Sequence, residues 1–293
     1  MHVINEAIAP LYALYHGDCV ETLKGLPSDS VHLTVTSPPF QSLYTYSNTE
    51  RDIGNSGSVD EFTEHLRFVI RELWRVTVPG RLAAFHCAQV PAMLGRDGYI
   101  GLKDFRGDLI RTFCDEAWVY HGEVCIDKDP QAQAIRTHAK ALLFNQLRKD
   151  SSWLRPALAD YILIFRKPGD NQTPITPDIT NNEWIEWARP IWYGIRESDT
   201  LQYSSARGAD DERHICPWQL GTIERCVRLW TNQGETVLDP FAGIGSTPYT
   251  AVRHGRFGIG IELKESYFAV AARNLAEASA TKDDLFTFAG VSV

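Results

Sequence analysis

Short apolar runs alternate with amphipathic segments along most of the chain. Runs rich in β-branched and aromatic residues predict strands, and they fall at 11–16, 31–35, 81–87, 118–126, 161–165, 235–238 and 256–261. Apolar residues recur at helical spacing over 20–26, 59–75, 107–117, 217–230 and 267–278, and a further helix ends near 254. Strands that alternate with helices in this way predict an α/β protein with a largely parallel sheet.

Two polar stretches break the alternation. The segment 41–58 is rich in Ser, Thr, Asn and Gly and predicts a binding loop, in which Tyr44 and Tyr46 either contact a base or sugar or pack the loop down. The segment 170–212 mixes Pro, Asn, Thr and Asp with Trp and Tyr and predicts an insert outside the sheet. An exposed insert would suit a duplex or an extruded base, whereas a buried one would be only a small irregular subdomain. Its candidate DNA contacts are Arg189, Arg196 and Arg207.

The stretch 127–160, between two predicted strands, is helical in pattern and basic in its second half. Clustered cations of this kind predict a surface that faces DNA phosphates. The alternative is an ordinary solvated helix face, which is the commoner fate of such a run. The candidate phosphate contacts are Arg136, Lys140, Arg148 and Lys149.

The composition narrows the class of protein. The chain has 293 residues, of which 44% are hydrophobic, and this allows one large domain or a domain with a small insert. It contains no apolar run of about 18 residues and no signal-peptide pattern, so we expect no membrane span and a cytoplasmic protein. The six cysteines form no C-x-x-C pair, which disfavours zinc and indicates reduced thiols. A net charge of −8 argues against a generally basic coat and leaves nucleic-acid binding to a local patch.

The strand at 31–35 continues into Thr36-Ser37-Pro38-Pro39-Phe40. The chain must leave the sheet there, because a proline has no N–H and cannot continue a central strand. It then presents the Ser37 hydroxyl, two proline carbonyls and the Phe40 ring, a set that suits a flat ring bearing an exocyclic amine. The alternative is a Pro-Pro turn that closes a buried strand, with Phe40 in the core.

A second motif, Asp-Pro-Phe-Ala-Gly-Ile-Gly-Ser at 239–246, follows the strand at 235–238. Glycines before a helix N-terminus let the backbone approach a nucleotide, and Glu262, which ends the next strand, can accept ribose hydroxyls. Pro248 stands where a dinucleotide fingerprint has its third glycine, and no phosphate-loop lysine follows, so NAD, FAD and ATP are disfavoured. Asp18, after the first strand, is either a contact at the same sheet edge or a helix N-cap.

The two motifs resemble those of amino-group DNA methyltransferases that use S-adenosylmethionine. Residues 239–246 are similar to the cofactor motif of that family and 36–40 to its catalytic motif, in the order of its β class. The resemblance spans nearly the whole chain and is weakest over 170–212. It implies a Rossmann-like methyltransferase fold with a mostly parallel seven-stranded sheet, helices on both faces and a circularly permuted motif order. It also implies a catalytic half at 1–169, a target-recognition insert at 170–212 and a cofactor-binding half at 213–293.

The resemblance further implies roles for individual residues. Asp18 would contact the adenine end of S-adenosyl-L-methionine and Glu262 its ribose hydroxyls, while the turn 241–245 would pass beside the methionine moiety. The other implied cofactor contacts are Thr36, Pro217, Asp239, Pro240, Phe241, Ala242, Gly243, Gly245 and Ser246. The implied catalytic group is Ser37, Pro38, Pro39 and Phe40.

The family chemistry is methylation of an exocyclic amine on a base flipped out of duplex DNA. Ser37 Oγ and the Pro38 carbonyl would accept the amine hydrogens and Phe40 would stack on the base, with no covalent cysteine intermediate. Ser-Pro-Pro-Phe resembles N4-cytosine enzymes more than N6-adenine enzymes, so we expect N4-cytosine, with N6-adenine as the alternative. A non-catalytic DNA-binding relative and an RNA or protein methyltransferase are less favoured. The expected partner is double-stranded DNA, and a cognate restriction endonuclease and a homodimer are compatible with the family.

Overall fold

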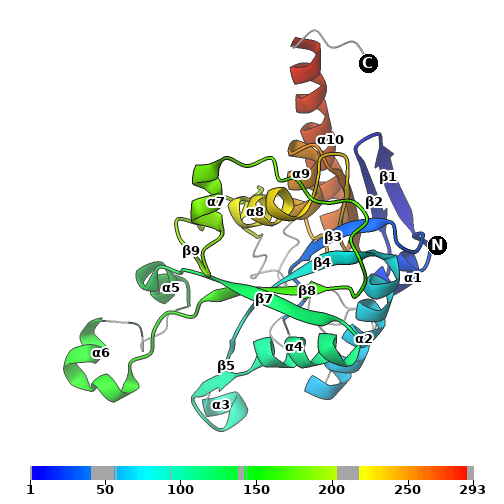
Figure 1. Cartoon of the computed structure of the whole chain (residues 1–293). Helices are drawn as coiled ribbons and strands as arrows, with labels where there is room; N and C mark the ends of the chain where they lie inside the picture. The colour runs from blue at the N-terminus through cyan, green and yellow to red at the C-terminus, as the bar shows by residue number, and fades with distance from the viewer. Residues whose placement is uncertain are drawn as a thin grey trace.

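The computed structural model describes residues 2–40, 56, 58–92, 94–137, 142, 144–202 and 218–288. Its centre is a nine-stranded sheet in the order β1-β2-β11-β10-β3-β4-β8-β7-β9 (Figure 1). In that order, the strands are Asn5–Ala9, Tyr12–His16, Phe257–Glu262, Thr236–Asp239, Val31–Thr36, Thr77–Ala88, Asp160–Arg166, Val119–Ile126 and Ile191–Trp192. The strands from β2 to β7 form the expected mostly parallel sheet, and β1 and β9 extend it at its two edges.

The sheet has a switch point between β10 and β3. The strands β2, β11, β10, β3 and β4 are parallel, and β8 is antiparallel to both β4 and β7. From β10 the chain crosses through α9 to β11 on one side, whereas from β3 it crosses through α2 to β4 on the other. In open α/β sheets, ligands bind outside the carboxyl ends of the strands at such a point. Both sequence motifs begin there, because β3 ends at Thr36 and β10 ends at Asp239.

Helices cover both faces of the sheet (Figure 1). One core cluster joins α1, α2 and α4 to one face, and two others join α8, α9 and α10 to the opposite face. Because the inner strands are buried on both sides, their sequences are nearly continuous apolar runs rather than alternating ones. The bounds of these helices are Cys19–Leu23, Val59–Val76, Phe105–Asp115, Leu220–Trp230, Ser246–Arg253 and Glu265–Phe288.

Smaller elements lie between the strands of the sheet. Between β7 and β8 the chain forms α5 (Pro130–Thr137), α6 (Phe144–Lys149) and a 3-10 turn at Ser151–Trp153, which agrees with the predicted helical stretch. After β4 it forms the pair β5 (Val90–Ala92) and β6 (Gly101–Lys103), with α3 (Leu94–Asp97) between them. These last three elements were not predicted, because they are too short to show a periodic pattern.

The described part of the predicted insert, 170–202, does not lie outside the sheet, so that expectation was wrong. It carries α7 (Asn181–Trp187) and β9, and β9 pairs in parallel with β7. Trp192 of β9 is fully buried in the core. Arg256, also fully buried, donates to both carboxylate oxygens of Asp178 at 2.8 and 3.0 Å and thereby ties this segment to the start of β11.

Two further expectations concern the chain as a whole. Within the described ranges, no helix is both long enough and apolar enough to cross a membrane. The five cysteines that the structure describes, Cys19, Cys87, Cys114, Cys125 and Cys226, are free thiols.

Candidate active site

The two motifs meet at the border between β3 and β10. The strands pair in parallel, with Leu33 opposite Val237 and Thr34 opposite Leu238, so their carboxyl ends emerge side by side. At those ends the Thr36 hydroxyl donates a hydrogen bond to Asp239 Oδ1 at 2.5 Å. Residues 203 positions apart in the chain are thus joined by one buried contact, as the split-site prediction requires.

Asp239 is buried, and its environment opposes ionisation. Burial raises the pKa of this carboxyl to about 6, against the hydrogen bond from Thr36 and a second one from the backbone amide of Phe241 at 3.0 Å. These two bonds also define the start of the glycine turn that follows. A carboxyl that titrates near neutrality at the switch point is a candidate contact for a cationic ligand group.

The turn after Asp239 depends on two glycines with positive φ. Gly243 has φ +55° and an open space where a Cβ would stand, while Gly245 has φ +87° and would bring a Cβ to 3.1 Å from the Cβ of Ala271. Both conformations are strained for residues with a side chain. Gly243 therefore leaves room for a ligand against the backbone, whereas Gly245 permits close packing of α9 on α10.

Glu262 ends β11 beside this turn. Its Oε2 accepts from the Gly243 amide at 2.8 Å and its Oε1 accepts from the Lys264 amide at 2.7 Å. The next strand, β2, leads into Gly17, whose amide donates to the Glu262 carbonyl at 3.0 Å. Asp18 follows as the N-cap of α1 and accepts from the Glu21 amide at 2.9 Å. The capping interpretation of Asp18 is therefore confirmed, and its contact with adenine stays a prediction.

These residues fit an adenosine-bearing cofactor. The open space at Gly243, the Asp239 carboxyl and the Glu262 carboxylate lie in sequence along the carboxyl ends of β10 and β11. A carboxylate at the end of the strand after the glycine turn is placed to accept ribose hydroxyls. Among the described residues, no group of three or more His, Cys, Asp or Glu side chains could hold a metal ion.

Ser37 contacts a histidine that sequence reasoning missed. Its Oγ lies 3.0 Å from Nδ1 of His86 on β4, and Nε2 of His86 lies 3.1 Å from Oδ2 of Asp160 on β8. The same carboxylate oxygen lies 2.7 Å from Nζ of Lys128, just after β7. Burial on its own would raise the pKa of Asp160, but His86 and Lys128 outweigh it and hold that pKa at about 2. No motif links these three residues, so only their meeting at one sheet edge reveals them.

Phe40 and Trp218 enclose the same imidazole. The Phe40 ring lies 6.0 Å from that of His86 in a tilted arrangement and 5.7 Å from Phe105 edge-on. Trp218, buried just before α8, stacks on His86 at 4.9 Å with 23° between the planes. Phe40 is only partly buried, so one part of it packs on the core cluster and another part stays accessible. Both interpretations of Phe40 thus hold in part.

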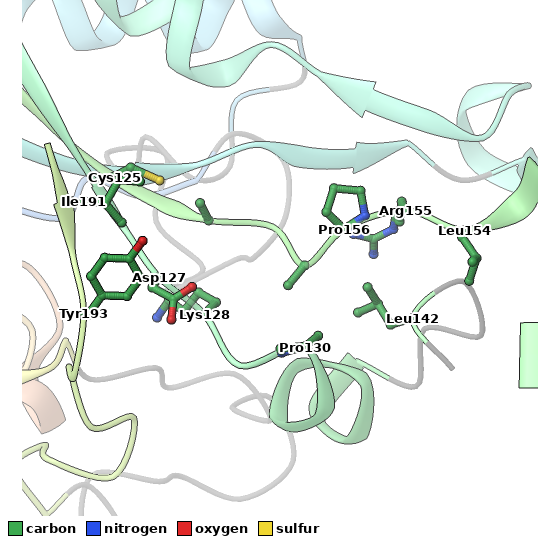
Figure 2. A pocket seen from close by; sticks show the side chains of 12 residues that line it. Cys125, Asp127, Lys128, Pro130, Leu142, Leu154, Arg155, Pro156, Ile191 and Tyr193 are labelled. Atoms are coloured by element: carbon green, nitrogen blue, oxygen red, sulfur yellow. The ribbon is translucent and has the colours of Figure 1, made fainter. Parts of the chain in front are cut away.

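A cavity of about 630 Å³ lies at the same edge of the sheet, beside the ends of β7 and β9 (Figure 2). Tyr193, Asp127 and Lys128 lie along one side, and Arg155 with Pro156 lies on the other. Because Lys128 also contacts Asp160, the cavity adjoins the far end of the polar row that begins at Ser37.

The candidate DNA contacts are only partly described. Arg148 and Lys149 are exposed at the end of α6, and Arg189 and Arg196 are exposed between α7 and α8. Arg148 lies over the Phe144 ring at 5.2 Å. Contact of these side chains with DNA stays a prediction. Outside the described side chains lie Tyr44, Tyr46, Arg136, Lys140 and Arg207, and also the proposed cofactor contact Pro217.

Comparison with known proteins identifies the family. Residues 31–273 match the DNA methylase family of N6 and N4 methyltransferases, and the chain belongs to it. It is therefore a DNA methyltransferase of the N4/N6 class, and its cofactor is S-adenosyl-L-methionine. The β-class resemblance, the methyltransferase fold and the cofactor expected from the sequence are confirmed.

Individual relatives cover most of the chain. The type II methyltransferase M.ScaI of Streptomyces caespitosus is 26% identical over 269 residues, which are 89% of this chain and 80% of that protein. The DNA adenine methyltransferase YhdJ of Escherichia coli (strain K12) is 25% identical over 91% of this chain and 83% of its own length.

Solved structures share the fold. TTHA0409 of Thermus thermophilus, complexed with S-adenosyl-L-methionine, superposes with a TM-score of 0.65 at 26% identity over 91% of this chain and 95% of that one. The cytosine-N4-specific PvuII DNA methyltransferase superposes with a TM-score of 0.66 at 17% identity, over 95% of each chain.

Proposed function

We propose that the protein methylates the N4 amine of a cytosine flipped out of duplex DNA. The observation that carries this proposal is the hydroxyl of Ser37, which lies at the switch point and has His86 Nδ1 as a partner 3.0 Å away. A hydroxyl that donates its own hydrogen to an imidazole keeps its oxygen lone pairs for a second donor, such as an amine. The Ser-Pro-Pro-Phe motif favours cytosine over adenine.

The residues of the chain position the base and its amine. S-adenosyl-L-methionine, when bound, supplies an electrophilic methyl group carried on a sulfonium. The lone pair of an exocyclic amine is conjugated with the ring, so the amine must be oriented before it can attack. Ser37 Oγ and the Pro38 carbonyl accept the two amine hydrogens, and the accessible part of Phe40 stacks on the ring. Acceptors that are fixed in advance lower the barrier because they need no reorganisation during the reaction.

The cofactor side of the site follows the same edge. Glu262 holds the ribose hydroxyls, the turn that includes Gly243 passes beside the methionine moiety, and Asp239 faces its cationic groups. The remaining turn residues Pro240, Phe241, Ala242, Gly245 and Ser246 shape this wall, with Thr36 behind Asp239. Asp18 closes the adenine end, next to Glu262 across the β2–β11 pairing.

The target base is tested by its product. DNA from a host that expresses the protein is digested to nucleosides and analysed by mass spectrometry, and we expect N4-methylcytosine. N6-methyladenine as the sole product would contradict the cytosine assignment. Adenine is the second candidate because YhdJ, an adenine methyltransferase by name, is about as similar to this chain as M.ScaI is.

The role of Ser37 is tested by Ser37→Ala. We expect this variant to bind the cofactor as the wild type does and to lose most methyl transfer, because one of two amine acceptors is gone. The matched control is Ser30→Ala, since the exposed Ser30 hydroxyl donates only to the Pro27 carbonyl at 2.7 Å, before β3 begins. Unchanged turnover in Ser37→Ala would remove this hydroxyl from the mechanism.

Recognition of duplex DNA is assigned to the segment 170–212 and to the basic end of α6. Support comes from the exposed cations Arg148, Lys149, Arg189 and Arg196 at or near the carboxyl edge of the sheet. Relatives such as M.ScaI are named type II methyltransferases, which supports a restriction-modification setting. Methylation-aware sequencing of exposed DNA would report the recognised sequence, and random methylation would contradict site-specific recognition.

A further inference from the structure

The polar row behind Ser37 follows the strands of the sheet in order. Ser37 ends β3, His86 lies on β4, Asp160 begins β8 and Lys128 follows β7, and these four strands are consecutive neighbours in the sheet. The contacts along the row are 3.0 Å from Ser37 Oγ to His86 Nδ1, 3.1 Å from His86 Nε2 to Asp160 Oδ2, and 2.7 Å from that oxygen to Lys128 Nζ. A row of this kind can pass a proton from one end toward the other.

We propose that His86 is a positioning residue that takes up, through Ser37, the proton lost by the methylated amine, and that Asp160 and Lys128 hold its imidazole in the required tautomer. The inference rests on the proposed function and deepens it, because the four residues would serve an amine of either base. It assigns a role to three residues that neither sequence motif contains.

The charges along the row decide the tautomer of His86. Asp160 is ionised at neutral pH, since its pKa is held at about 2 by His86 and by Lys128 against the opposing effect of burial. A carboxylate beside Nε2 favours a proton on that nitrogen, which leaves the Nδ1 lone pair to accept from the Ser37 hydroxyl. The same logic orients the imidazole in a Ser-His-Asp triad, where a buried carboxylate fixes the base and stabilises its protonated form.

Other neighbours of His86 leave this arrangement undisturbed. Among the described residues, the rings packed on His86 are those of Trp218 and Phe40, and both are uncharged. Asp239, the nearest acid of the cofactor side, contacts Thr36 on β3 rather than the imidazole. The charged groups that face His86 are thus Asp160 and, through it, Lys128, whose side chain is 3% exposed.

The proton balance requires such an acceptor. As the new N–C bond forms, the methyl C–S bond breaks and its electron pair remains on sulfur. The methylated amine then carries one proton more than the neutral product. It gives that proton to Ser37 Oγ while Ser37 gives its hydroxyl proton to His86 Nδ1, so the hydroxyl is regenerated and the imidazole becomes imidazolium. Asp160 stabilises this cation until the proton leaves to solvent.

The decisive variant is His86→Asn. An Asn side chain can place an oxygen acceptor near the position of Nδ1, so it can still orient the Ser37 hydroxyl, but it cannot take up a proton. In single-turnover methylation of duplex DNA, we expect a loss of about a hundredfold, as for removal of a general base. We also expect the variant to lose the fall in rate that protonation of an imidazole causes in the wild type below about pH 7. A wild-type rate and pH profile in the variant would overturn the proposal.

Two controls separate this role from a structural one. His32→Asn is the matched variant, because His32 also lies on β3 and its Nδ1 accepts a backbone hydrogen bond from Thr236 at 3.1 Å, but at the opposite end of the strand. We expect it to keep the wild-type profile. In the double variant Ser37→Ala/His86→Asn, the rate should be no lower than in Ser37→Ala alone. Losses that multiply would mean that His86 acts independently of Ser37, contrary to the proposal.

A measurement on the cofactor-free protein covers the case in which His86→Asn fails to fold. The ¹⁵N chemical shifts of the His86 ring in the wild type should indicate a proton on Nε2, and Asp160→Asn should weaken that preference. A proton on Nδ1 in the wild type would overturn the relay. The product assay keeps the two proposals distinct, because N6-methyladenine from the wild type contradicts only the proposed base, whereas an unchanged rate in His86→Asn contradicts the relay for either base.

Discussion

The buried carboxyl between β10 and β3 should make stability depend on pH, and Asp239→Asn tests this. Burial raises the pKa of Asp239 from its ordinary value of 3.8 to about 6 in the folded protein. A group whose folded pKa lies above its unfolded pKa contributes stability below the unfolded value, and loses it as the pH rises through the folded one. Asp239 therefore stabilises the fold in acid and ceases to do so above about pH 6.

The magnitude follows from the pKa difference. One pKa unit corresponds to about 1.4 kcal/mol, so the complete loss is on the order of 3 kcal/mol, of which about 2 kcal/mol falls between about pH 4.5 and 7.5. In Asp239→Asn, an uncharged amide occupies the position, and its oxygen can still accept from Thr36 and Phe241. The difference in unfolding free energy between the wild type and the variant should therefore change by about 2 kcal/mol across that range, in favour of the wild type at low pH.

The assay is equilibrium unfolding in urea of the cofactor-free protein at several pH values. The matched control is Asp60→Asn in α2, where the side chain is exposed and its substitution should leave the pH dependence unchanged. Curves of stability against pH that run parallel for the wild type and Asp239→Asn would refute the reasoning. The same carboxyl predicts that a cofactor with cationic groups binds more tightly as the pH rises through about 6, and that the variant loses this dependence.

Three further predictions concern the turn, the core and DNA. Gly245→Ala should cost about 2 kcal/mol of stability, whereas Gly243→Ala, with open space for its Cβ, should cost less and instead weaken cofactor binding; unfolding and calorimetric titration measure the two effects. Arg256→Ala should cost about 3–5 kcal/mol, because it leaves the carboxylate that pairs with it without its partner, and urea unfolding measures the loss. Arg148→Ala combined with Lys149→Ala should weaken DNA binding and lower the slope of log affinity against log salt by about one for each phosphate that the variant no longer neutralises, whereas an unchanged slope would exclude this surface.

Most of the strands and both motifs could be predicted because their signals are local. β3, β10 and β11 are apolar runs buried on two faces, and such runs show in the sequence whatever surrounds them. The turn after β10 needs glycine for its positive φ values, so it too is visible in the chain. The capping of α1 by Asp18 was one of two local interpretations, and the structure confirmed it.

The edge of the sheet was less predictable. β9 has two residues, and its place beside β7 depends on the burial of Trp192 and on the contact of Asp178 with Arg256. Asp178 and Arg256 are 78 positions apart, and nothing in either neighbourhood announces the other. The segment therefore resembled an irregular insert, although part of it completes the sheet.

By itself, the sequence determined that a parallel α/β sheet carries two motifs, a cofactor turn and a Ser-Pro-Pro-Phe strand end, because each motif is contiguous and needs particular residues for its own backbone. Only the tertiary structure decided what stands behind Ser37. His86, Asp160 and Lys128 come from three different strand ends, and strand order alone brings them into one row. Strand order arises from long-range pairing, which leaves no trace in the spacing of residues along the chain.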